Sequence, residues 1–258
     1  MSMIELSIDD AVAEIVLNAP HRLNALDEAA LTDLAAAYDA AAAAGVRALL
    51  LRGAGRGFCA GRDIARVDPA EDDAYGYLAG AVTPLLRKMA DFPAPTFAAV
   101  HGACLGVGLG LAIATDVVYV ADEAKLGSPF AGLGATLDSG GHWLFTERLG
   151  PHRALDLIYS AEFMSGSEAV AAGLFSRALP TEELLDFSRR RARRAAEGAT
   201  GAFLASRELV AGIRDRRIGL WESVEAENVA QGRLCSSADY LEGFRAFQEK
   251  RRPVFTGR

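Results

Sequence analysis

The stretch TFAAVHGACLGVGLG, residues 96–110, decides how the rest of this sequence is interpreted. Its first five residues are mostly apolar and predict a short buried strand. The glycine-rich segment that follows predicts a tight turn opening a helix over residues 106–114. A second apolar strand pattern occupies residues 117–121. A strand, a helix and another strand in this order are typical of an α/β fold with mostly parallel strands.

The same alternation extends toward the N-terminus. Apolar residues alternate with polar ones in two short runs separated by Asp9 and Asp10, which predicts a hairpin. Asp27 is placed to cap a helix, and Gly45 is placed to end it. The elements predicted here are strands at 4–8, 12–17 and 46–51 and helices at 27–44 and 74–92.

The C-terminal part reads differently, because helical patterns follow one another after about Ser160 with almost no strand pattern. Ser165 and Glu168 have the spacing of a capping box. We therefore expect a core over residues 1–190 and a helical region over residues 191–258 that packs on the core and on neighbouring subunits. The later predicted helices cover residues 181–197, 201–213, 218–234 and 237–250.

Composition excludes several classes of protein. The 258 residues are 51% hydrophobic and 24% charged, which rules out wholesale disorder and fibrous repeats. A net charge of −7 disfavours unaided nucleic-acid binding, and we read the arginine-rich run at 188–194 as a solvated helix face. Three widely spaced cysteines and the absence of a signal-peptide pattern predict a cytoplasmic protein. The apolar stretch 94–120 is interrupted too often to span a membrane.

Common site signatures are missing. Gly106, Gly108 and Gly110 do not complete the GxGxxG pattern of dinucleotide-binding proteins, and no phosphate-binding loop or GxSxG elbow is present. The four histidines form no metal-binding pair, so no metal is expected.

Two strand-to-helix junctions, residues 58–64 and 101–110, carry the chemistry that the sequence does offer. Backbone amides at the start of a helix are well placed to receive an anionic oxygen, and each junction can donate one amide to a shared oxyanion. The alternative is that these glycines serve only turn geometry and close packing.

Together with their neighbours, these junctions carry a resemblance. Five segments resemble the crotonase (enoyl-CoA hydratase/isomerase) superfamily, and the resemblance extends over nearly the whole chain. The segments are RLNAL (22–26), GFCAGRDI (57–64), residues 95–116, AKLG (124–127) and GFRAFQEKR (243–251). The resemblance implies a spiral of ββα units with a helical C-terminal trimerisation region. It also implies an acyl-CoA thioester substrate, no separate cofactor, and a homotrimer or a dimer of trimers.

The resemblance also implies a site. The amides of Arg62 and Val107 would bind the thioester oxygen, Arg22 would lie near the CoA phosphates, and Phe247 and Lys250 would reach the nucleotide of an adjacent subunit. The family usually has glycine where Val107 stands and often a small residue where Arg62 stands. Other substrate-binding positions would be Leu23, Ala25, Ala60, Asp63, Ile64, Gly106, Phe130, Leu133 and Trp143.

The two glutamates that hydratases of this family use fall on Gly110 and Phe130, and neither of these can transfer a proton. The segment LGATLDSGGHWL, residues 133–144, resembles ring-1,2-epoxyphenylacetyl-CoA isomerases and Δ3,Δ2-enoyl-CoA isomerases, in which an acid at the position of Asp138 shuttles a proton. One carboxylate is enough to shift a double bond, and apolar neighbours would raise its pKa. We therefore expect an acyl-CoA isomerase with Asp138 as its acid/base.

Other roles stay open at this point. Asp138 has the setting of a helix cap before Ser139, and His142 one turn later is either its partner or an ordinary surface histidine. Asp138 would serve a hydratase as the single acid/base, or act as a nucleophile as in aromatic acyl-CoA dehalogenases. A non-catalytic acyl-CoA-binding or RNA-binding relative is the remaining alternative.

Overall fold

The computed structural model describes residues 3–65, 67–68 and 70–257. Its main sheet has six strands in the order β1-β2-β3-β4-β6-β9, and a smaller sheet has the order β5-β7-β8. The β1–β2 hairpin is antiparallel, and the remaining pairs of the main sheet are parallel. The strands are β1 Ile4–Asp9, β2 Val12–Leu17, β3 Ala48–Gly53, β4 Thr96–Val100, β5 Ala103–Leu105, β6 Val117–Ala121, β7 Lys125–Gly127, β8 Met164–Ser165 and β9 Arg177–Leu179.

Consecutive strands alternate between the two sheets before the chain enters a helix. β4 belongs to the main sheet and β5 to the small one, and α4 (Val107–Ile113) follows. β6 and β7 repeat this order before the 3-10 helix η3 (Pro129–Leu133). These repeats confirm the predicted α/β core built from ββα units.

Four short strands were not predicted. β5 lies inside the segment assigned to a glycine-rich turn, β7 was not assigned, and β8 and β9 follow residue 160, where almost no strand was expected. Each has only two or three residues, which is too short for an apolar alternation to show in the sequence. β9 forms the outer edge of the main sheet beside β6.

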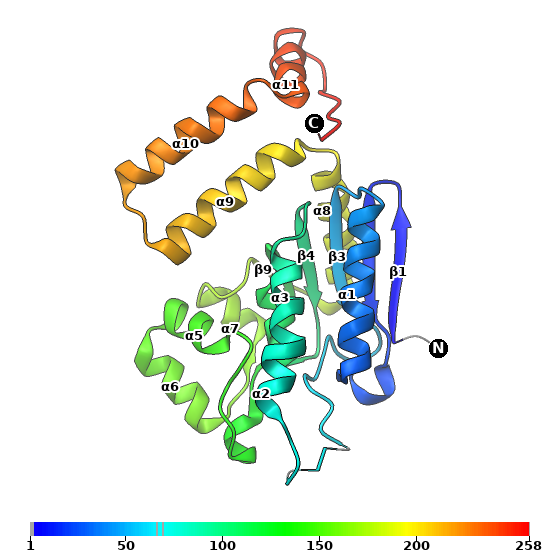
Figure 1. Cartoon of the computed structure of the whole chain (residues 1–258), viewed down its shortest axis with the longest axis vertical. Helices are drawn as coiled ribbons and strands as arrows, with labels where there is room; N and C mark the ends of the chain where they lie inside the picture. The colour runs from blue at the N-terminus through cyan, green and yellow to red at the C-terminus, as the bar shows by residue number, and fades with distance from the viewer. Residues whose placement is uncertain (1–2, 66, 69, 258) are drawn as a thin grey trace.

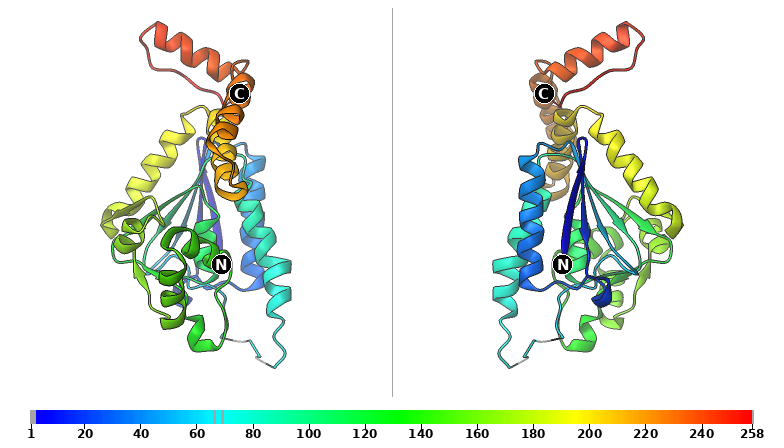
Figure 2. Two further views of the ribbon diagram at one scale, coloured as in Figure 1. Left: turned by 90° about the vertical axis from the view of Figure 1, so that its left-hand side faces the viewer. Right: turned by 90° about the vertical axis from the view of Figure 1, so that its right-hand side faces the viewer.

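Helices cover both faces of the main sheet (Figure 2). α1 (Glu28–Ala43) and α3 (Thr83–Ala90) lie on one face, and α8 (Thr181–Ala196) lies on the other. α1 begins where the sequence predicted, because the Asp27 carboxylate accepts a hydrogen bond from the Ala30 amide at 2.9 Å. The segment before α3 contains α2 (Ala74–Gly76) and the π-helical turn η2 (Tyr77–Val82).

The helical C-terminal region projects from one end of the core (Figure 1). The predicted boundary at residue 190 falls inside α8, whose Ala192 and Ala196 are still buried in the core. The predicted capping box is present, since Ser165 and Glu168 exchange hydrogen bonds at the start of α7. The remaining helices are η1 Pro20–Arg22, α5 Gly141–Leu149, α6 Pro151–Ser160, α7 Gly166–Ala171, α9 Thr200–Arg216, α10 Leu220–Leu234 and α11 Ala238–Gln248.

None of the helices in the described part of the chain has the length and apolar character that crossing a bilayer requires. The arginine-rich run lies on α8. There Arg189 pairs with Glu14 at 2.8 Å and Arg193 pairs with Asp9 at 3.2 Å. Both acids belong to the β1–β2 hairpin.

Glu14 joins three elements of the core. Its carboxylate accepts hydrogen bonds from Arg52 on β3 at 2.6 Å and from Arg189 on α8 at 2.8 Å. Burial acts to raise the pKa of Glu14, but the two guanidinium groups outweigh it and hold the pKa below its ordinary value. The ionised form is therefore the one that the fold stabilises.

Replacing Glu14 with Gln should lower the free energy of unfolding at neutral pH by about 1–2 kcal/mol, because two charge-assisted hydrogen bonds weaken in a half-buried site. A lowered folded-state pKa gives stability that is present above the ordinary glutamate pKa and is lost as the pH falls through the folded value. Urea unfolding of Glu14→Gln should therefore approach wild type at acidic pH. Asp39→Asn, which breaks the exposed pair with Lys88, is the control and should change stability by less than about 0.5 kcal/mol.

Candidate active site

Three backbone segments form a short ladder at the end of the core. The Leu26 amide donates to the Gly61 carbonyl at 2.8 Å, and the Ala60 amide donates to the Leu23 carbonyl at 2.9 Å. On the other side, the Leu105 amide donates to the Cys59 carbonyl at 3.0 Å. The ladder brings the RLNAL segment and both predicted junctions together.

Asn24 holds the first of these segments in place. This buried side chain donates to the carbonyls of Ala54, Gly57 and Phe58 at 2.9, 2.8 and 3.1 Å and accepts from the Ala19 amide at 2.8 Å. Nothing in the RLNAL motif predicts this role for Asn24. Its left-handed backbone, with φ 57°, is a conformation that asparagine adopts more readily than most residues.

The two segments that carry the predicted oxyanion amides approach each other closely because Gly61 has no side chain. Gly61 has φ 93°, and a Cβ there would lie 2.7 Å from the Leu105 carbonyl oxygen and 3.4 Å from the Val107 nitrogen. Arg62 follows Gly61 directly, and Val107 is the first residue of α4. In the ranges that the structure describes, neither amide donates to a backbone carbonyl. Both N–H groups therefore lack a backbone acceptor among the described residues.

At the two positions where hydratases of this family have glutamates, other residues fill the space. A Cβ on Gly110 would overlap the Cβ of Ser139 and lie 2.9 Å from its carbonyl oxygen. Phe130 lies over Gly106, where an added Cβ would come 2.8 Å from the ring carbon Cζ. No carboxylate fits at the first position unless the segment that carries Asp138 and Ser139 moves.

Asp138 does not cap α5. That helix begins at Gly141 with Gly140 as its N-cap and with no side-chain capping bond, and Asp138 contributes only its carbonyl, which accepts from the Gly141 amide at 2.9 Å. Its carboxylate oxygen Oδ1 and the Ser139 hydroxyl are buried without a hydrogen-bond partner among the described residues. The capping alternative is therefore wrong, and the carboxylate remains available for chemistry.

The surroundings of Asp138 suit a general base. Burial raises the pKa of the Asp138 carboxyl, and the Ser139 hydroxyl, Arg62 and His142 act in the opposite direction without cancelling it. His142 is exposed and contacts the Thr136 hydroxyl at 3.4 Å. Its contribution to Asp138 is thus one of charge alone.

The side chains of two residues that sequence analysis did not select complete this region. The guanidinium of Arg62 pairs with Asp72 at 2.7 Å and lies 4.2 Å from the centre of the Tyr77 ring. Tyr77 is buried, and its hydroxyl donates to the Leu26 carbonyl at 3.4 Å. Neither residue belongs to a recognisable motif. Each is brought to Arg62 by the path of the backbone through residues 72–77.

The other predicted substrate-binding residues fall into two groups. Arg22 and Asp63 pair at 2.6 Å next to the ladder, where Leu23, Ala25 and Ala60 also lie. Ile64, Leu133 and Trp143 have exposed side chains, and Trp143 lies against Arg214 of α9 at 5.2 Å.

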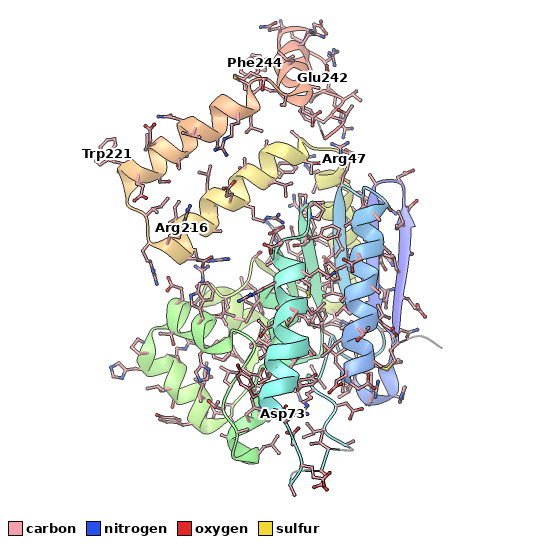
Figure 3. All side chains as sticks on the ribbon, viewed as in Figure 1. Arg47, Asp73, Arg216, Trp221, Glu242 and Phe244 are labelled. Atoms are coloured by element: carbon pink, nitrogen blue, oxygen red, sulfur yellow. The ribbon has the colours of Figure 1, made fainter. Side chains whose placement is uncertain are left out.

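Phe247 and Lys250 lie far from this region within one chain. α11 is at the opposite end of the molecule from α2, as Figures 1 and 3 show through the labelled Phe244 and Asp73. The Phe247 side chain is 85% exposed. Within one chain, the predicted contact of these two residues with the substrate is therefore not formed.

Comparison with known proteins identifies the family. The sequence model of the enoyl-CoA hydratase/isomerase family matches residues 7–258. This chain belongs to the enoyl-CoA hydratase/isomerase family. The crystal structure of enoyl-CoA hydratase subunit I from Geobacillus kaustophilus matches it with a TM-score of 0.89 and 32% identity, covering 99% of this chain and 98% of that one. The predicted crotonase fold is confirmed.

Relatives within the family carry different names. The chain is 35% identical over 255 residues to "Probable enoyl-CoA hydratase" of Rhodobacter capsulatus, covering 99% of this chain and 98% of the relative. It is 32% identical over 263 residues to 1,2-epoxyphenylacetyl-CoA isomerase of Escherichia coli, covering 100% of both. Membership of the enoyl-CoA hydratase/isomerase family therefore leaves the reaction to be argued from the site.

Asp138→Asn should raise the free energy of unfolding at neutral pH. A carboxyl whose folded-state pKa is raised favours folding only while it is protonated, so stability is lost as the pH rises through the folded value. The amide cannot ionise, and the variant should match wild type only below the ordinary aspartate pKa. Urea unfolding at neutral and acidic pH measures the difference.

Asp27→Asn is the matched control, with the opposite sign. The hydrogen bond from the Ala30 amide and the nearby Arg22 hold the pKa of Asp27 below its ordinary value. Its neutral variant should lose stability at neutral pH. Equal responses of the two variants would show that the Asp138 carboxylate is not in a desolvated setting.

Proposed function

We propose that this member of the family is an enoyl-CoA isomerase that needs no separate cofactor and uses Asp138 as its only acid/base. One observation carries the proposal: the Asp138 carboxylate is half-buried and its Oδ1 atom has no hydrogen-bond partner among the described residues, while Gly110 and Phe130 stand where hydratases have glutamates. Ser139 connects the two features, because it follows Asp138 and packs on Gly110, within the first turn after Val107.

The proposed reaction moves one proton. The thioester oxygen of a 3-enoyl-CoA accepts hydrogen bonds from the amides of Arg62 and Val107. The Asp138 carboxylate removes a proton from C2, and the electron pair of the broken C–H bond enters a dienolate whose negative charge the two amides stabilise. The protonated Asp138 returns the proton at C4, which gives the 2-enoyl-CoA and restores the carboxylate.

The raised pKa of Asp138 supports this cycle. A base that must remove a proton and then return it works best when its pKa lies near the pH at which it acts. Burial shifts the pKa of Asp138 upward, in that direction. Hydration of a double bond instead requires groups that activate water and protonate C2, and the two positions that supply them in hydratases hold Gly110 and Phe130. Water addition through Asp138 alone is the second candidate.

We further propose that helices α9, α10 and α11, here called the helical arm, pack on other copies of the chain in a homotrimer or a dimer of trimers. An apolar cavity of about 390 Å³ lies between α9, α10 and α11, with Tyr240, Phe244 and Phe247 in its lining. Trp221 is 80% exposed at the outer end of α10 (Figure 3). Large aromatic surfaces of this kind are typical of protein interfaces.

The direct test compares the products that wild type and Asp138→Asn form from 3-enoyl-CoA and 2-enoyl-CoA thioesters. Wild type should interconvert the two. Asp138→Asn should lose turnover by roughly 10²-fold or more while still binding the thioester. Asp33→Asn, an exposed change on α1, is the control and should keep full activity. Formation of a 3-hydroxyacyl-CoA as the main product would favour the hydratase. Wild-type turnover in Asp138→Asn would end the proposal.

A second prediction concerns the nucleotide end of the substrate. Lys250→Ala should weaken binding of butyryl-CoA by about two- to fivefold at low salt, because an exposed lysine contributes mainly by charge. The difference should shrink as salt rises. Lys88→Ala on α3 serves as the control in the same calorimetric titration. Unchanged affinity at low salt would remove Lys250 from the site.

A further inference from the structure

The side chain of Arg62 has no role in the proposed reaction so far, yet it is held on two sides. Its Nη1 and Nη2 atoms donate to the two carboxylate oxygens of Asp72 at 2.9 and 2.7 Å, a bidentate arrangement that fixes the plane of the guanidinium. The same plane lies over the ring of Tyr77, with 4.2 Å from Cζ to the ring centre.

Further contacts hold the backbone on both sides of the Arg62 amide. Leu26 fixes the backbone on both sides of Arg62, because its amide donates to the Gly61 carbonyl and its carbonyl accepts from the Asp63 amide, both at 2.8 Å. The Tyr77 hydroxyl donates to the same Leu26 carbonyl at 3.4 Å. Tyr77 therefore touches Arg62 through its ring and the neighbouring backbone through its hydroxyl.

The Arg62 charge also acts on Asp138. Burial raises the pKa of Asp138, and the charges of Arg62 and His142 act to lower it. Burial also raises the pKa of the Tyr77 hydroxyl, with a smaller contribution from Asp138 in the same direction. The hydrogen bonds to Asp72, and to a smaller extent the charge of Glu28, raise the pKa of Arg62. The same cation thus interacts with Asp72, which fixes its orientation, and with the acid that would transfer the proton.

We propose that the Arg62 guanidinium, held by Asp72 and Tyr77, is a positioning group that fixes the amide that Arg62 offers to the thioester oxygen. A second effect, that of its charge on Asp138, rests on the proposed role of Asp138. Positioning of the amide requires the planar guanidinium with its two hydrogen bonds to Asp72, whereas the effect on Asp138 requires only a positive charge. Lysine and arginine are therefore not equivalent at this position. The two effects can be separated by substitution.

The experiment uses Arg62→Met, Arg62→Lys and Asp72→Asn, all in a His142→Gln background that removes the other side chain whose charge lowers the pKa of Asp138. The carbon-13 NMR titration of the Asp138 carboxyl, assigned by its loss in Asp138→Asn, reports the charge effect in the free protein. Calorimetry with butyryl-CoA reports the amide. Neither readout needs turnover, so both remain measurable if the isomerase assignment fails.

Arg62→Met should move the Asp138 titration to higher pH and weaken butyryl-CoA binding by about tenfold, the equivalent of one well-placed hydrogen bond. Arg62→Lys should keep the wild-type titration but show the weaker binding. Asp72→Asn should leave the titration in place or move it to lower pH, because Arg62 then loses its counter-charge, and should also weaken binding.

Two outcomes would overturn the inference. Wild-type affinity in Arg62→Met would show that the side chain does not position the amide. An Asp138 titration that is the same in Arg62→Met and Arg62→Lys would show that the charge does not act on Asp138. If Arg62→Met fails to fold, Arg62→Gln removes the same charge while keeping a polar side chain, and the same comparison with Arg62→Lys applies.

Discussion

Two backbone segments approach each other at Gly61 more closely than any side chain would allow. The missing Cβ of Gly61 leaves room for the Leu105 carbonyl and brings Arg62 next to the first turn of α4. The ladder to Leu26 and the buried Asn24 side chain keep the opposite side of the segment in place. Preorganised amides stabilise a developing negative charge because no reorganisation is needed when it forms. The rest of the site depends on this contact.

The residues that pack against α4 decide which acid/base group can lie near the proposed amide pair. Gly110 leaves room for Ser139, and this contact brings Asp138 to the helix that carries the Val107 amide. A glutamate at position 110 and the present path of residues 138–139 exclude each other. The absence of a glutamate at position 110 and the position of Asp138 are thus two consequences of one packing arrangement.

Much of this could be predicted from the sequence, since glycines, strand patterns and the resemblance placed both junctions, the parallel core and the helical arm. Asp138 was also found, but its capping alternative could be removed only by the position of Gly140 as the N-cap of α5. Tyr77 and Asp72 could not be found, because their roles arise from contacts across the fold with Arg62. Strands of two or three residues, such as β8 and β9, carry no periodicity to detect.

Deuterium exchange into a bound thioester tests the central claim most directly, because it reports proton transfer by Asp138 whether or not a product accumulates. In deuterated water, the wild-type protein should introduce deuterium at C2 or C4 of an enoyl-CoA, as followed by NMR or mass spectrometry of the recovered thioester. Asp138→Asn should leave these positions protonated while the thioester remains bound. Exchange at the wild-type rate in Asp138→Asn would contradict the account.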